Sequence, residues 1–374
     1  MNLSEHRSTS ATFSAPKARV LIVDDNIINL KVAVGLMQPY HMQVMTVDSG
    51  KAAISMLRSK DFDIVFMDHM MPVMDGVETT GHIRKMDGEY YKKLPIIALT
   101  ANAVNGVREM FIESGLNDFI AKPIELSALD RVLKTWLPHE LIMPPVPVEH
   151  SKNENKNPGA NAVHSDSRFI SVSKGISYTG GNEAAYYDIL EVYARKGEEK
   201  RLQIDDYADK EDWKNYIIEV HALKSTSLSI GAAELSELAK KLELAGKAGD
   251  YDTIIKENGA LSLLYGQVIT ESARLVNERK KLTAPEKENT AEAPAEDISA
   301  EKLSECISAI EEACSDFDGD VIIGRAKEMS AYTFGGKPLK PYFDKIAEAA
   351  ADFEYDGSLE ELNKMMIELE LRKE

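Results

Sequence analysis

The sequence predicts two fold classes in one chain: an α/β doubly wound domain with a five-stranded parallel sheet, then an all-α helical bundle and a further α-helical tail. Short apolar runs alternate with amphipathic segments in the first part of the chain, as parallel strands and covering helices do. After residue 168 no run reads as a convincing strand, and short glycine-containing connections separate helical patterns, which is typical of antiparallel helices in a bundle. The five expected strands are RVLIV (19–23), MQVMTV (42–47), DIVFM (63–67), PIIAL (95–99) and DFIA (118–121).

Composition shifts divide the chain into domains and linkers. Proline, asparagine and charged residues dominate two stretches, which are therefore expected to be linkers. A polar, Ser/Thr-rich start is expected to be disordered. The predicted order is a lead-in at 1–16, the α/β domain at 17–137, a linker at 138–167, the bundle at 168–280, a linker at 281–297, and an accessory helical domain at 298–374.

Charge and composition exclude several classes of function. The 374 residues carry a formal net charge of -18, so no binding of nucleic acid through a broad basic surface is expected. No apolar run approaches the roughly 18 residues that a membrane-spanning helix needs. The two cysteines, Cys306 and Cys314, lie at no metal-ligand spacing with histidines. We expect a cytoplasmic chain that neither inserts into membranes nor binds nucleic acid.

Five polar residues follow the expected strands. Asp24 and Asp25 follow the first strand, Asp68 the third, Thr100 the fourth and Lys122 the fifth. The carboxyl ends of parallel strands meet at one edge of a sheet, where open α/β folds bind ligands. Packed carboxylates repel one another, and a bound Mg²⁺ relieves this repulsion. The set therefore predicts Mg²⁺-assisted capture of a phosphoryl group by one carboxylate, with a lysine and a hydroxyl around the phosphoryl oxygens.

Four segments of the sequence resemble the receiver family of response regulators, whose fold is flavodoxin-like. They are VDDNIINL (23–30), MDHMMPVMDG (67–76), ALTAN (98–102) and FIAKP (119–123). The resemblance implies that Asp68 is the phosphoacceptor and that Asp24, Asp25, Asp68 and the backbone carbonyl of Met70 hold Mg²⁺. It also implies a switch hydroxyl at Thr100, a phosphate-binding Lys122, a rotating aromatic at Phe119, a small gating residue at Ala101, a cis bond before Pro123, and a docking face at Asn26–Asn29. His69, beside Asp68, is expected to face solvent without a catalytic role.

A second phosphate carrier is predicted in the helical segment. In VHALKSTS (220–227), His221 lies mid-helix with Lys224 and Ser225 three and four residues on, so the three share a face. A histidine that relays phosphate must be exposed and close to neutral, with a cation nearby and a small neighbour that leaves room for a docking partner. The pattern resembles the histidine-phosphotransfer (HPt) signature, with Ser225 where glycine is common. The resemblance implies phosphotransfer by His221, supported by Lys224 and Ser225.

Together these features predict a phosphorelay protein resembling the carboxyl end of a hybrid histidine kinase, and not an enzyme in the usual sense. The expected partners are an upstream histidine kinase and a downstream receiver domain. A linker of about 30 residues has a flexible span of roughly 30 Å, which permits transfer within one chain. Two alternatives stay open: a phosphorylation-switched binding module in which His221 is idle, and a phosphatase or cyclase that acts through the acidic pocket. The direction of net phosphate flow, and whether the chain is a fragment of a larger kinase, also stay open.

Overall fold

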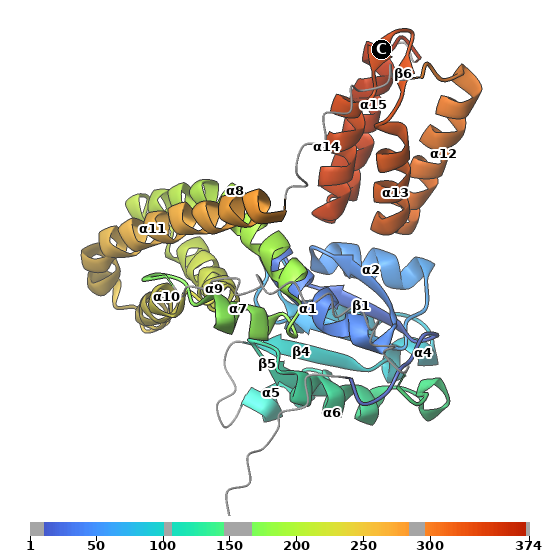
Figure 1. The fold of residues 1–374 in the computed structure, drawn as a ribbon. Helices are drawn as coiled ribbons and strands as arrows, with labels where there is room; N and C mark the ends of the chain where they lie inside the picture. Colours follow the sequence, from blue (N-terminus) through green and yellow to red (C-terminus); the bar gives the residue numbers. More distant parts are fainter. Residues whose placement is uncertain (1–10, 101–106, 146–166, 284–295, 372–374) are drawn as a thin grey trace, which may run out of the picture. The chain divides into compact units, whose positions relative to one another are not determined.

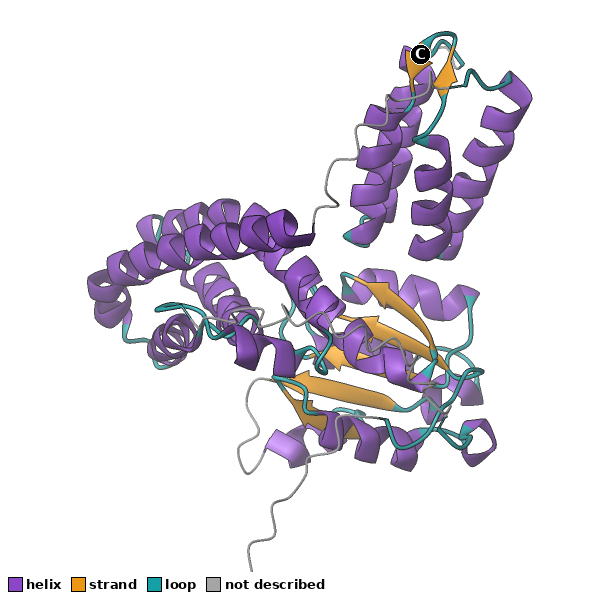
Figure 2. Ribbon diagram, in the orientation of Figure 1, coloured by secondary structure: helices purple, strands orange, loops and turns teal. Residues whose placement is uncertain are grey.

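The computed structural model describes residues 11–100, 107–145, 167–283 and 296–371. The chain divides into two compact units, residues 1–283 and 284–374, which are described separately below (Figure 1). The first unit holds a parallel sheet with its helices and then a set of long helices, and the second is mainly helical (Figure 2). Within the described ranges, no helix combines the length and the apolar character needed to cross a membrane.

The α/β part of the first unit is a five-stranded parallel sheet in the order β2-β1-β3-β4-β5. Every residue of β3 and β4 is buried, because these central strands are covered on both faces. The order of the sheet reverses between β1 and β3, which places a topological switch point at their carboxyl ends. The strands are β1 (Arg19–Val23), β2 (Gln43–Val47), β3 (Ile64–Asp68), β4 (Ile96–Thr100) and β5 (Asp118–Ala121).

Side-chain caps begin three of the helices between the strands. Asn26, Ser49 and Asp75 each accept a hydrogen bond from a backbone N–H in the first turn of the following helix. These caps set where the chain turns back from each strand end. The helical segments are α1 (Ile27–Met37), η1 (Gln38–Tyr40), α2 (Gly50–Ser59), α3 (Gly76–Arg84), α4 (Glu89–Lys93), α5 (Val107–Glu113), α6 (Leu126–Trp136) and η2 (His139–Leu141).

The sheet domain extends beyond its expected limits at both ends. Ser14, within the predicted lead-in, pairs with Met143, within the predicted linker, through two backbone hydrogen bonds of 3.0 and 2.8 Å. Phe13 and Ala15 are buried, and the Phe13 ring packs on Tyr40. The prediction of a disordered lead-in is therefore wrong for residues 13–15, and the prediction that the linker begins at 138 is wrong for Met143. Both segments belong to the sheet domain, because Phe13 is buried in it and Ser14 pairs with Met143.

Five helices follow in the first unit, and the four long ones pack on one another. Buried Tyr193 donates to or accepts from Ser227 at 3.0 Å, and Tyr186 donates to the carbonyl of Ile230 at 3.1 Å. Gly231 has φ +85°, and a Cβ there would lie 2.1 Å from a backbone oxygen, so only glycine fits the turn. The helices are α7 (Val172–Tyr178), α8 (Glu183–Asp209), α9 (Trp213–Ser229), α10 (Ala233–Lys247) and α11 (Tyr251–Thr283).

The second unit has its own apolar core of leucine, isoleucine, methionine and aromatic side chains, together with both cysteines. The segments AIEEACSDFDGD (309–320) and KIAEAAADFEYDG (345–357) are similar in sequence. Their phenylalanines, Phe317 and Phe353, both have positive φ (57° and 59°) and lie just after the end of a helix. A short antiparallel hairpin, which the sequence does not predict, separates the two helical pairs. The elements are α12 (Ala300–Asp316), α13 (Gly319–Met329), β6 (Thr333–Phe334), β7 (Lys337–Pro338), α14 (Lys340–Ala351) and α15 (Tyr355–Glu368).

Candidate functional site

Three carboxylates meet at the switch point of the sheet. Asp24 and Asp25 leave β1, and Asp68 is the last residue of β3. One carboxylate oxygen from each lies within 4.8 Å of the others. Asp24 and Asp68 are almost fully buried, whereas Asp25 is partly exposed. The cluster is therefore a deep acidic cup with one carboxylate at its rim.

Lys122 supplies the positive charge of this cup. Its Nζ donates to Asp24 Oδ2 at 2.6 Å and forms an ion pair with Asp68 Oδ1 at 2.9 Å. The amide of Asn29 donates to the other oxygen of Asp24 at 3.0 Å. The lysine and the amide thus hold Asp24 from both sides, and the same lysine is the ion-pair partner of Asp68 Oδ1.

Burial and crowding perturb the pKa values in the cup. Burial, then repulsion by Asp24 and Asp68, raises the pKa of Asp25 to about 8. Burial also raises the pKa of Asp24, although the charge of Lys122 opposes it. Burial acts to lower the pKa of Lys122, but the attraction of the two aspartates outweighs it and raises that pKa. A single lysine thus leaves the three acids with unbalanced negative charge.

The donor set fits a divalent cation that prefers oxygen ligands. All three side chains are carboxylates within reach of one ion, and no sulfur or imidazole is among them. A cation would relieve the repulsion that raises the pKa of Asp25. These are the properties of a Mg²⁺ site.

The remaining residues expected at this edge are distributed as follows. Thr100 is buried at the end of β4, Phe119 lies on β5, and Met70 lies two residues beyond Asp68 in the loop after β3. The peptide bond between Lys122 and Pro123 is cis. Ala101 lies outside the described residues.

His221 departs from its expected exposure. The sequence predicts an imidazole that protrudes into solvent, but only 3% of the residue is exposed. The ring is not lost in apolar packing: it faces the ring of His69 from the α/β domain, with centroids 5.4 Å apart. The expectation was wrong because a helix face that points away from its own bundle is here covered by the other domain of the same unit.

Hydrogen bonding decides which nitrogen of His221 is available. Its Nδ1 lies 2.7 Å from Oε1 of Glu243. Burial acts to raise the pKa of Glu243, but the hydrogen bonds of this carboxyl to His221 and Lys224 outweigh burial and lower the pKa. An ionised carboxylate only accepts, so Nδ1 carries the proton. Nε2 then holds the free lone pair, and it has no hydrogen-bond partner in the described part of the chain. The arrangement presents Nε2 as a nucleophile.

Glu243 is a functional candidate that the sequence analysis missed. It is 1% exposed and also pairs with Lys224 and, at 2.6 Å, with Lys247. The ammonium of Lys224 therefore binds Glu243 and is not available to screen a phosphoryl group. Burial lowers the pKa of Lys224, although the Glu243 carboxylate opposes this shift. The signal was present: Glu243 lies four residues after Ala239 in the apolar stripe of α10, where a charge needs partners.

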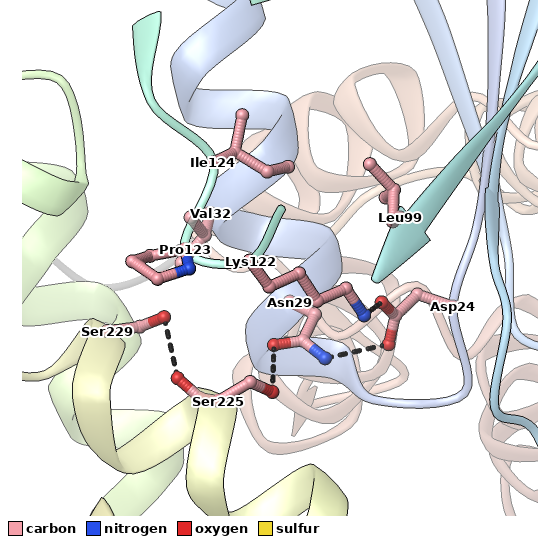
Figure 3. Close-up of a pocket in the computed structure, with 9 residues that line it drawn as sticks. All are labelled: Asp24, Asn29, Val32, Leu99, Lys122, Pro123, Ile124, Ser225 and Ser229. Carbon is pink, nitrogen blue, oxygen red and sulfur yellow. Dashed lines mark hydrogen bonds and ion pairs between the residues drawn. The ribbon is translucent and has the colours of Figure 1, made fainter. Parts of the chain in front are cut away.

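The bundle and the acidic cup meet around a small pocket (Figure 3). Ser225 Oγ donates to Asn29 Oδ1 at 3.4 Å, and the same Asn29 amide binds Asp24. Lys247 Nζ lies 3.7 Å from the sulfur of Met70. Asn29, in the predicted docking face at Asn26–Asn29, and the small residue Ser225 are thus adjacent.

His69 also differs from its expectation. Its side chain is 17% exposed rather than solvent-facing, and its Nδ1 lies 3.3 Å from the carbonyl oxygen of Leu99 and 3.9 Å from Asp68 Oδ1. Burial, and then the charges of His221 and Lys122, lower the pKa of His69 to about 3. The ring is therefore neutral, and the contact with Asp68 is not an ion pair.

Two family models match the chain. The response regulator receiver domain matches residues 20–134, and the Hpt domain matches residues 188–269. Among known proteins, the sensor histidine kinase GacS of Pseudomonas protegens is 39% identical over 126 residues, which are 33% of this chain and 14% of that protein. The sensor protein GacS of Pseudomonas syringae pv. syringae is 28% identical over 246 residues, 66% of this chain and 25% of that protein.

The chain thus spans a quarter or less of the length of these two relatives. Among solved structures, the receiver domain of a sensor histidine kinase from Pseudomonas aeruginosa, with a magnesium ion in its active site cleft, is 36% identical. That match covers 32% of this chain and 96% of the other, with a TM-score of 0.30.

Proposed function

We propose that this chain, which carries a response regulator receiver domain and an Hpt domain, relays phosphate from Asp68 to His221 and onward to another receiver. The observation that carries the proposal is that His69 contacts both groups: its ring meets the ring of His221 with centroids 5.4 Å apart, and its Nδ1 lies 3.9 Å from Asp68 Oδ1. Nε2 of His221 has no hydrogen-bond partner among the described residues. No separate catalytic base is needed, because transfer between these two groups requires only alignment and charge neutralisation.

In the loading step, Asp68 Oδ1 forms a bond to the phosphorus of an upstream phosphodonor, the bond between phosphorus and the donor atom breaks, and the electron pair of that bond stays with the donor. Asp24, Asp25, Asp68 and the carbonyl of Met70 would hold Mg²⁺, which supplies charge neutralisation for the incoming phosphoryl oxygens. Lys122 releases Asp68 to bind a phosphoryl oxygen while it keeps its bond to Asp24, and Thr100 offers a hydroxyl. Phe119 and Ala101 would respond to the phosphoryl group as a switch.

In the transfer step, the lone pair on Nε2 of His221 forms a bond to phosphorus and the bond between phosphorus and Asp68 oxygen breaks. The electron pair returns to the Asp68 carboxylate. The proton on Nδ1 stays in its bond to Glu243, which stabilises the positive charge that the ring acquires. Lys224 and Lys247 hold Glu243 in place, and Ser225 keeps the approach of the receiver open.

The upstream phosphodonor would be a histidine kinase and the downstream acceptor a receiver domain of another protein. The relatives named as sensor kinases support this assignment. The chain itself would act as a phosphoacceptor and carrier with Mg²⁺ as its cofactor, and not as a kinase.

The test compares wild type, Asp68→Ala and His221→Gln after incubation with acetyl phosphate and Mg²⁺. Phosphoaspartate is labile to base and phosphohistidine is labile to acid, so the two labels are separable. We expect both labels in wild type, neither in Asp68→Ala, and only the aspartate label in His221→Gln. Wild type that carries only the aspartate label would instead support a binding switch in which His221 is idle.

A further inference from the structure

We propose that His69 is a positioning residue that orients the His221 ring for attack on phosphorylated Asp68. This inference rests on the proposed function and adds to it a residue next to the phosphoacceptor. The two imidazole rings meet edge to face, with centroids 5.4 Å apart and planes at 76°. Such a geometry is a favourable aromatic contact and fixes the relative orientation of the two rings.

His221 needs a second restraint of this kind. Its Nδ1 is held by Glu243, but one hydrogen bond at one side of a ring leaves the ring free to tilt about that bond. Nε2, the nucleophilic atom, has no hydrogen bond of its own among the described residues. The edge-to-face contact with the His69 ring adds a second restraint on the direction of the lone pair.

His69 is itself rigidly placed relative to Asp68. Its backbone N–H donates to the carbonyl oxygen of Leu99 at 3.2 Å, and its Nδ1 lies 3.3 Å from the same oxygen. Leu99 pairs with Asp68 in the register between β3 and β4. The ring that contacts His221 is thus anchored to the same strand pair as the phosphoacceptor, so movement of one is coupled to movement of the other.

The contact also connects His221 to the switch aromatic. The His69 ring meets Phe111 at 5.9 Å and 74°, and Phe111 lies 6.4 Å from Phe119. Aromatic contacts therefore run from β5 through α5 to the His221 ring. A change of the Phe119 rotamer would reach His221 through this row of rings.

The experiment uses the full chain and a single turnover. Wild type, His69→Ala, His69→Phe and the matched control His82→Ala are loaded with acetyl phosphate and Mg²⁺, and the growth of base-stable label on His221 is followed. His82 is an exposed histidine on α3, half of whose side chain is in solvent. The rate of Asp68 loading is measured separately with each substitution in the His221→Gln background.

We expect His69→Ala to slow transfer about tenfold, the factor that an aromatic contact of about 1.4 kcal/mol provides. Asp68 loading should stay at the wild-type rate. His69→Phe should restore transfer to within about threefold of wild type, because it keeps a ring at this position. His82→Ala should match wild type.

Each other outcome has a distinct meaning. Equal transfer in wild type and His69→Ala would overturn the role of His69 while the relay stands. Equal slowing by His69→Ala and His69→Phe, or loss of Asp68 loading in His69→Ala, would also overturn it, because the ring contact would then not be the cause. Failure of wild type itself to label His221 would refute the relay.

Discussion

Replacing Glu243 with glutamine should separate the chemistry of His221 from the fold of the bundle. The carboxylate accepts from His221 Nδ1 at 2.7 Å, and such a charge-assisted bond contributes about 1.5–3 kcal/mol. Phosphorylation of Nε2 makes the ring cationic, so this bond strengthens during transfer. The amide oxygen of glutamine still accepts but carries no charge. We therefore expect about half of this stabilisation, roughly 0.7–1.5 kcal/mol, to be lost from the transition state, which slows transfer about three- to tenfold.

The same substitution should lower stability, because Lys224 loses its buried counter-charge. Its side chain is 9% exposed, and we expect a cost of about 2–3 kcal/mol in the free energy of unfolding. The matched control is Glu257→Gln, which removes an exposed pair with Lys241 and should change stability by less than about 0.5 kcal/mol.

The assay follows base-stable label after acetyl phosphate loading, with urea unfolding measured in parallel. A folded Glu243→Gln variant that transfers at the wild-type rate would refute the role of this carboxylate. Slower transfer in Glu257→Gln would show that the effect is not local to His221.

Three further predictions follow from charge and packing. Because the pKa of Glu243 is lowered by folding, its ionised carboxylate stabilises the fold fully above the ordinary pKa of 4.5, and this contribution declines as the pH falls below 4.5. The difference in melting temperature between wild type and Glu243→Gln should therefore be larger at pH 7 than at about pH 3.5. Lys122→Met should lower the free energy of unfolding of the receiver domain by about 3 kcal/mol at pH 8. Millimolar Mg²⁺ should raise the melting temperature of this variant more than that of wild type. Equal effects of Mg²⁺ on the two melting temperatures would argue against a cation site at the three aspartates. Gly76→Ala should lower the free energy of urea unfolding by at least about 2 kcal/mol, because its Cβ would lie 2.1 Å from the backbone oxygen of Asp68, whereas Gly81→Ala, with open space around it, should be neutral or slightly stabilising.

The sheet was predictable from sequence to within a residue at each strand. Two strands shift by one residue at both ends: β3, expected at 63–67, is found at Ile64–Asp68, and β4, expected at 95–99, is found at Ile96–Thr100. Asp68 joins the ladder opposite Leu99 although a buried carboxylate is unfavourable in a strand, because Lys122 lies beside it. The sequence pattern predicts a helix over Glu183–Arg195, whereas α8 runs to Asp209. Its polar second half has no apolar stripe to reveal it and is supported by ion pairs such as those of Arg201 with Glu198 and Asp205.

The sequence by itself determined which chemical groups this protein places at its strand ends and on α9. Strand periodicity puts Asp24, Asp25 and Lys122 at one edge of a parallel sheet, and helical periodicity turns His221 away from the core of its own bundle. Only the tertiary structure decided what covers that histidine. Periodicity reports how each element faces its own core, and it carries no information about contacts between separately folded domains. The placement of His69 against His221 depends on such a contact between domains. The placement of Glu243 against His221 depends on the packing of α10 on α9 within the bundle.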